Sequence, residues 1–157
     1  QDRYKISLPI EFGVGGSVRP TPELLVAASV HFGDWTQSEY VGSDVNDVRS
    51  DVSFEDRYRD VKRYHIGVEY QVPRVALDLR VGYYTDPLPF IGPRDSDDSI
   101  IIAKQDRRFL TLGFGLLLEE AVRANVAWTR GTFEVTEGLL EESNTLNRAL
   151  FGINYLF

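Results

Sequence analysis

Large apolar residues alternate with small or polar ones at every second position in seven segments of the chain. The alternation is clearest over residues 110–118, where five large apolar side chains are interleaved with Thr111, Gly113, Gly115 and Leu117. A period of two predicts a β-strand, because successive side chains of a strand point to opposite faces of a sheet. The other six predicted strands cover about 10–18, 24–32, 64–70, 75–83, 122–129 and 148–157.

The two faces of these strands differ in a way that indicates the surrounding solvent. A water-soluble barrel or sandwich has an apolar inner face and a charged outer face. Here one face is apolar at about five consecutive positions per strand, while the other carries single charges among glycines. This pattern favours a lipid-facing band around a polar lumen. A lipocalin-like soluble barrel is the alternative.

The connections between the strands alternate in length. Short turns at 19–23, 73–74 and 119–121 alternate with long polar loops at about 36–62, 86–107 and 131–146. Outer-membrane barrels combine short periplasmic turns with long extracellular loops, and aromatic girdles mark both membrane interfaces. The sequence therefore predicts an all-β fold, an antiparallel transmembrane β-barrel of the outer membrane. Its predicted girdles are Tyr70, Tyr155 and Phe157 on the short-turn side and Phe32, Trp35, Tyr83 and Trp128 towards the long loops.

Composition excludes several classes of function. The chain has no cysteine, which excludes disulfides, thiol nucleophiles and cysteine-ligated metals. Its net charge of −7 argues against a nucleic-acid partner, because phosphate contacts need a basic surface. No nucleotide-binding or redox motif is present, so no cofactor is predicted.

Ionisable and amide side chains on the second face are the candidate lumen network. Counting back from the turns places Glu11 across from His31 and Glu69 across from Asp78. Arg80 is then the diagonal neighbour of Glu69. Cross-strand neighbours lie about 5 Å apart, within reach of an ion pair. The network either satisfies charges structurally or gates the pore and steers a carboxylate. Its members are Glu11, His31, His65, Glu69, Asp78, Arg80, Arg123, Asn125 and Arg148.

The residues of the candidate network do not have the spacing expected of a metal site or of a catalytic pair. A metal site at His31 and His65 would need a third ligand, and Glu11 is the only obvious candidate near His31. Ser29 and His31 share a face, but two residues along a strand separate side chains by about 6–7 Å. That is too far for the hydrogen bond of a nucleophile and its base. No metal and no enzymatic activity are predicted.

Two further features concern the ligand and assembly. Leu88, Phe90 and Ile91 form an apolar patch in a polar loop, where they either contact a hydrophobic ligand or fold over the barrel mouth. The final strand carries Tyr155 and Phe157 at alternate positions. This ending resembles the signal that the outer-membrane assembly machinery reads.

Several segments, in order, resemble the later half of FadL/TodX-type outer-membrane transporters of long-chain fatty acids and hydrocarbons. The resemblance implies a barrel of fourteen strands, of which this chain supplies the last seven, so that 1–157 is the C-terminal part of one barrel domain. The N-terminal half, with its plug and lateral exit, would be absent, and an odd strand count agrees with incompleteness. The similar segments are Leu8-Pro9, 19–24 (RPTPEL), 32–36 (FGDWT), 64–70 (YHIGVEY), 79–89 (LRVGYYTDPLP), 106–109 (DRRF) and 152–157 (GINYLF).

The function implied by the resemblance is passive, diffusive uptake of hydrophobic small molecules across the outer membrane of a Gram-negative cell. Long-chain fatty acids and aromatic hydrocarbons are the expected substrates. The expected partners are the substrate, outer-membrane lipid and lipopolysaccharide, the barrel assembly machinery and the remaining half of the barrel. The alternative is a non-transporting adhesin or anchor acting through its long loops, for which a lumen filled with side chains would argue.

Overall fold

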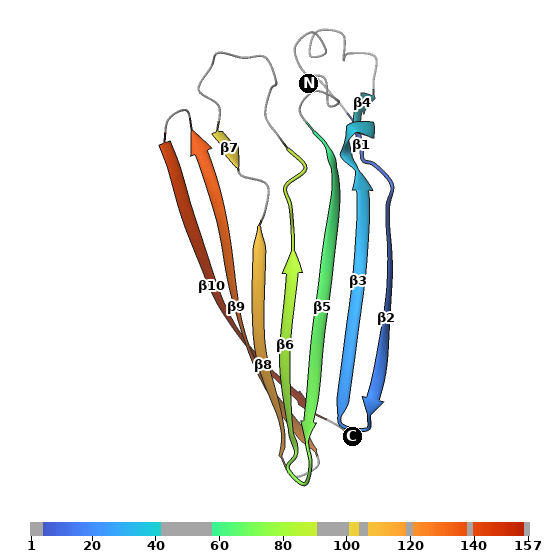
Figure 1. Ribbon diagram of the computed structural model, residues 1–157, viewed down its shortest axis with the longest axis vertical. Helices are drawn as coiled ribbons and strands as arrows, with labels where there is room; N and C mark the ends of the chain where they lie inside the picture. Colours follow the sequence, from blue (N-terminus) through green and yellow to red (C-terminus); the bar gives the residue numbers. More distant parts are fainter. Residues whose placement is uncertain are drawn as a thin grey trace.

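Seven long strands form a single antiparallel sheet in a computed structural model that describes residues 5–41, 58–90, 101–103, 107–118, 121–137 and 140–155. The order across the sheet is β10-β9-β8-β6-β5-β3-β2, so each strand pairs with its neighbour along the chain, and the prediction of seven strands is confirmed (Figure 1). The strands are β2 (Glu11–Thr21), β3 (Leu24–Asp34), β5 (Asp60–Val72), β6 (Leu77–Thr85), β8 (Arg108–Leu118), β9 (Val122–Glu137) and β10 (Leu140–Tyr155).

Among the described residues, three short strands and one 3-10 turn accompany this sheet. β1 (Lys5–Ser7) pairs with β4 (Glu39–Val41), and β7 (Ile101–Ala103) pairs with the far end of β9. The 3-10 turn η1 (Trp35–Gln37) follows β3. Asp34 caps it, and hydrogen bonds from the Thr36 side chain above all hold the pKa of the Asp34 carboxyl below its ordinary value.

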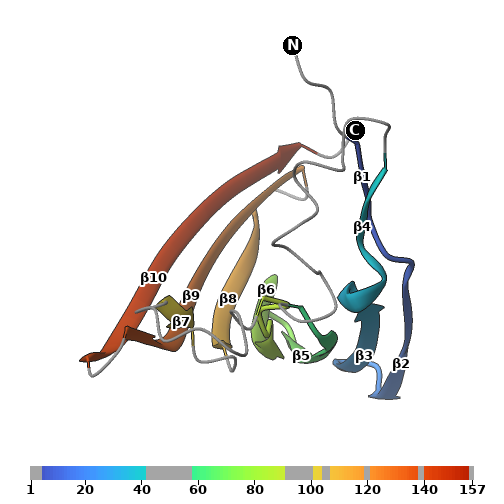
Figure 2. The ribbon, with the colours of Figure 1, turned by 90° about the horizontal axis from the view of Figure 1, so that it is seen from above.

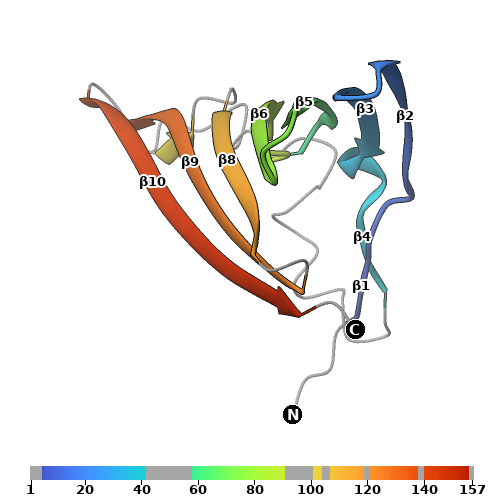
Figure 3. The ribbon, with the colours of Figure 1, turned by 90° about the horizontal axis from the view of Figure 1, so that it is seen from below.

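The sheet curves like part of a cylinder wall when it is viewed along the strands (Figures 2 and 3). The register aligns apolar residues in continuous rows across all seven strands, and we call the side that carries them the apolar face. The opposite side carries the ionisable residues and is called the polar face. One complete row of the apolar face is Val18, Val26, Val68, Val81, Leu112, Trp128 and Ala149.

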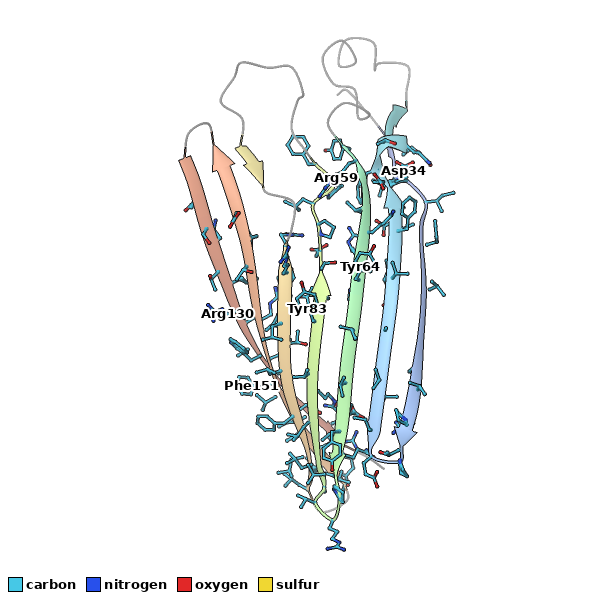
Figure 4. All side chains as sticks on the ribbon, viewed as in Figure 1. Asp34, Arg59, Tyr64, Tyr83, Arg130 and Phe151 are labelled. Atoms are coloured by element: carbon cyan, nitrogen blue, oxygen red, sulfur yellow. The ribbon has the colours of Figure 1, made fainter. Side chains whose placement is uncertain are left out.

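Burial in this sheet is the reverse of that in a soluble β-protein. The buried strand residues of the described chain that have side chains, Val61, Asp78 and Phe109, all lie on the polar face. Many large residues of the apolar face are exposed, up to 80% for Phe151, and the others described are half-buried. Tyr64 and Tyr83 project from the middle strands (Figure 4). Such a large exposed apolar surface requires an apolar partner or solvent.

The apolar face has dimensions that suit a bilayer. On β8 it runs from Leu110 to Leu118, which is about 27 Å along the strand at 3.4 Å per residue. The apolar band of outer-membrane barrels is about 25 Å tall. No helix in the described part of the chain has the length and apolar character needed to cross a membrane.

Two cross-strand pairings predicted from the sequence are wrong by two residues. Residues 73–76 form the turn between β5 and β6, with Arg74 in the left-handed region at φ 66°, so the strand begins at Leu77 and Glu69 faces Arg80 instead of Asp78. In the first hairpin the register shifts between Val18 and Thr21. Glu11 therefore faces Gly33, and His31 faces Gly13.

The predicted long loop at 131–146 is also wrong. β9 and β10 remain paired over this stretch, up to Glu137 opposite Leu140. Its residues are mostly polar, so they lack the apolar alternation that marks the membrane-spanning part, but Thr-rich segments still pair readily as strands. The predicted loop at 86–107 likewise contains β7.

Candidate functional site

Four ionisable residues of the polar face form an ion-pair network near the short turns, here called the lower cluster: Glu69, Asp78, Arg80 and Arg123. Arg80 is its centre, with Nε 2.7 Å from Glu69 Oε2 and Nη2 3.3 Å from Asp78 Oδ2. Arg80 Nη1 donates to Asn125 Oδ1 at 3.1 Å, and Arg123 Nη1 lies 3.8 Å from Asp78 Oδ2. The cluster joins β5, β6 and β9 through their side chains, which reach across β8.

Glycine on β8 makes this packing possible. A Cβ at Gly115 would lie 2.8 Å from Asn125 Oδ1 and 3.2 Å from Arg80 Nη1. The absence of a side chain lets the guanidinium lie close against the sheet, where Asp78 is only 7% exposed. Two carboxylates and two arginines balance within the lower cluster, which offsets the cost of burying them.

A second network, the upper cluster, lies towards the long loops and consists of Glu11, Arg63, Asp86 and Arg107. Arg63 Nε is 3.0 Å from Asp86 Oδ1, and Arg63 Nη1 is 3.3 Å from Glu11 Oε1. Arg107 forms an ion pair with the other Asp86 oxygen and donates from Nε to the Asp86 carbonyl at 2.9 Å. These four charges also balance, and they link β2, β5 and the residues beside β6 and β8.

Four rings form a row between the two clusters, called here the aromatic row: His31, His65, Tyr84 and Phe109. His31 and His65 meet edge to face with ring centroids 5.2 Å apart. His65 stacks on Tyr84 at 5.6 Å, and Tyr84 stacks on Phe109 at 4.6 Å with an interplanar angle of 7°. The row crosses β3, β5, β6 and β8 and ends on glycines, with His31 over Gly13 and Phe109 over Gly131.

Replacing Gly131 with alanine is expected to destabilise the sheet by about 1–3 kcal/mol, the usual cost of overpacking. The new Cβ would lie 2.6 Å from Phe109 Cδ1, and Phe109 is buried and stacked on Tyr84, so its ring cannot give way freely. Urea unfolding in lipid vesicles measures the loss. Gly152→Ala is the control, because its Cβ would meet nothing within 4 Å, and an equal effect of both changes would contradict the explanation.

Small residues leave a hollow in the polar face just below the aromatic row. Its volume is about 420 Å³, and it adjoins a second hollow of about 280 Å³ next to Glu69 and Arg80. The register pairs Ala27 with Gly67, Gly67 with Gly82 and Gly82 with Thr111, which places three nearly bare positions side by side. The larger hollow is floored by Ala27, Gly67 and Gly82 and edged by Ser29, His65, Tyr84 and Thr111.

The residues predicted for the lumen network separate into three groups, and one residue lies outside them. Glu69, Asp78, Arg80, Arg123 and Asn125 come together in the lower cluster. Glu11 belongs to the upper cluster, and the two histidines belong to the aromatic row. Arg148 lies exposed on β10, outside both clusters.

The separation predicted between Ser29 and His31 is wrong, because the Ser29 hydroxyl lies 3.4 Å from His31 Nε2. Neighbouring side chains on one face can lean along the strand, which the spacing of their Cα atoms does not reveal. No three His, Asp or Glu residues gather as a metal site within the described segments.

The loop and terminal residues are partly described. Phe90 packs its ring edge to face on Tyr58 at 5.4 Å, beside Arg59, whose Nε donates to the Leu88 carbonyl. Tyr155 is exposed on the apolar face at the short-turn end. Ile91 and Phe157 lie outside the described residues.

Sequence reasoning missed five residues of these clusters. All of them lie at or beyond the last apolar residue of a strand, where they had been assigned to loops or passed over. The signal available was the period of two, continued past Tyr64 to Arg63 and past Tyr84 to Asp86. The missed residues are Arg63, Tyr84, Asp86, Arg107 and Phe109.

The comparison with known families agrees with this geometry. A family model described as outer membrane protein transport protein (OMPP1/FadL/TodX) matches residues 2–150, whereas no curated protein matches the chain. Proteins of this family are outer-membrane β-barrels that transport hydrophobic compounds, and they are not enzymes. The chain therefore belongs to the OMPP1/FadL/TodX family of outer-membrane transport proteins.

Proposed function

We propose that this chain supplies the last seven strands of a fourteen-stranded barrel through which hydrophobic small molecules diffuse passively into the cell. Long-chain fatty acids and aromatic hydrocarbons are the proposed substrates. The remaining strands and the plug would come from the N-terminal half of the barrel. The assembly machinery would read Tyr155 and Phe157, and Leu88 and Phe90 would contact the substrate near the entrance.

One observation carries the proposal: the polar face is not filled by side chains. A small barrel that serves only as an anchor packs its interior with side chains. Here Ala27, Gly67 and Gly82 leave hollows between two self-neutralised ion-pair networks. A lumen of this kind offers an apolar solute a path past the polar lipopolysaccharide layer without chemical reaction.

The charge clusters have a structural role in this proposal. They link neighbouring strands through paired charges and keep the wall of the lumen in shape while a solute passes. Because each described cluster is balanced, it presents no net charge to a passing solute.

Two measurements test the proposed function. The intact mass of the protein extracted from outer membranes is expected to be about 40–50 kDa, as for one chain of fourteen strands with loops and plug. Cells that express the protein are expected to take up dodecanoate faster than cells that lack it. A mass near 18 kDa together with equal uptake would contradict the proposal and favour an adhesin or anchor.

A further inference from the structure

The larger hollow has the shape of a ligand site. Its floor consists of Ala27, Gly67 and Gly82 on three adjacent strands. The Thr111 hydroxyl lies over Gly82, where a Cβ would be 2.6 Å from it, so the backbone is bare mainly at Gly67. A Cβ at Gly67 would meet only the Val81 carbonyl oxygen, at 3.7 Å, so space above this position is open. Apolar cavities of about 150 Å³ hold a benzene molecule. The hollow, at about 420 Å³, has room for one or two rings while remaining open to the lumen.

The wall of the hollow is aromatic. His65 and Tyr84 border it, and their rings are held in place by stacking on each other and on Phe109. Because both neighbours fix the orientation of Tyr84, the wall is organised before any ligand arrives. Rings in such a wall favour an aromatic ligand, which can adopt the offset or edge-to-face contacts that aromatic pairs prefer.

The charged side chains near the hollow are already paired with other residues of the protein. Arg80 borders the adjoining hollow, but its nitrogens bind Glu69, Asp78 and Asn125. The uncharged hydroxyl groups at the edge of the larger hollow belong to Thr111, Tyr84 and Ser29, of which Ser29 already lies 3.4 Å from His31 Nε2. A carboxylate placed here would lose water without gaining a free cation, whereas an uncharged ligand loses little.

We propose that the hollow floored by Gly67 and Gly82 and walled by His65 and Tyr84 is a binding subsite for uncharged aromatic compounds. This inference rests on the proposed function, and it selects neutral aromatic compounds over fatty-acid anions at this point of the lumen. The bare backbone at Gly67 accepts the face of a ring, and a single hydroxyl substituent is satisfied by the Thr111 hydroxyl.

The test uses the full-length protein in detergent, titrated with fluorescent 2-naphthol and with 2-naphthoate, which has the same rings and a negative charge. Saturable 2-naphthol binding by fluorescence anisotropy is expected, with 2-naphthoate at least about tenfold weaker. Equal affinities for the two probes would overturn the charge argument. The absence of saturable 2-naphthol binding would overturn the subsite itself.

Gly67→Leu is the decisive variant, because its side chain fills the hollow while its Cβ makes only an ordinary contact, 3.7 Å from the Val81 carbonyl oxygen. It is expected to weaken 2-naphthol binding by about tenfold or more, whereas Gly152→Leu, on the same face and outside the hollow, leaves binding unchanged. Tyr84→Leu removes the stacked wall and is expected to weaken binding by about fivefold. Unchanged binding in folded Gly67→Leu and Tyr84→Leu, or an equal loss in Gly152→Leu, would reject the subsite.

Uptake by cells separates this inference from the function on which it rests. If expression of the protein speeds the entry of dodecanoate but not of 2-naphthol, the subsite is wrong and the proposed function stands. If neither compound enters faster, the proposed function fails as well. Faster entry of 2-naphthol that is lost in Gly67→Leu supports both.

Discussion

Phe114→Arg is expected to lower the free energy of unfolding of the membrane-inserted barrel by about 2–4 kcal/mol, the cost of an arginine at the bilayer midplane of a β-barrel. Phe114 is the central one of the five large apolar residues of β8 and is flanked on the apolar face by Leu79 and Val126. The substitution places a guanidinium in the lipid-facing band, beside Leu79 and Val126, where no described neighbour on the adjacent strands carries a carboxylate.

Thr111→Arg is the matched control for this change, because it puts the same side chain on the same strand but on the polar face. Urea titrations in phospholipid vesicles, followed by the electrophoretic mobility of folded and unfolded protein, measure both variants. Thr111→Arg is expected to stay within about 0.5 kcal/mol of the original protein. Equal destabilisation by the two arginines would show that the apolar face does not face lipid.

Arg80→Met is expected to cost about 2 kcal/mol of stability. Removing one partner from a buried ion pair costs about 3–5 kcal/mol, and this figure is reduced here because the Arg80 side chain is 36% exposed. The change leaves Glu69 without its partner and Asp78 with only the longer contact to Arg123.

Arg148→Met, on the same face but outside both clusters, is the control and is expected to change stability by less than about 0.5 kcal/mol. Adding Asp78→Asn to Arg80→Met removes one uncompensated charge and is expected to restore part of the loss. The same urea titration measures all three variants. If Arg80→Met and Arg148→Met were equally mild, the lower cluster would contribute nothing to stability.

Much of the fold was predictable because the lipid and the lumen impose opposite polarity on alternate residues. The pattern from Leu110 to Leu118 needs no tertiary information, since each apolar side chain faces the same solvent. All seven strands and the assignment of faces followed from this rule. The rule also explains why Glu69, Asp78 and Arg80 could be assigned to one face.

Register was harder to predict because it depends on backbone geometry at the turns. Val75 continues the apolar alternation and was therefore placed in a strand, yet it lies in a turn that contains Arg74 in a left-handed conformation. A shift of two residues keeps every side chain on its face, so the pattern cannot detect it. Both wrong pairings, Glu11 with His31 and Glu69 with Asp78, are of this kind.

Three residues of the upper cluster, and Tyr84 and Phe109 of the aromatic row, were missed for a different reason. Arg63 and Asp86 lie where the strands leave the apolar band, so both faces are polar and the alternation disappears. Hydrogen-bonded pairing continues past this point, as it does in β9 and β10. The sequence marks the limits of the lipid contact and not the ends of the strands.

The pairing of β9 with β10 beyond the apolar band has a mechanical consequence. Backbone hydrogen bonds continue from the row of Trp128 and Ala149 to Glu137 and Leu140. This part of the outer surface is therefore a rigid two-stranded extension of the sheet and not a flexible loop. A force applied at its tip, by a neighbouring molecule or by the surrounding polysaccharide, would be transmitted along the paired strands. It would arrive as torque on the barrel wall at the level of Trp128.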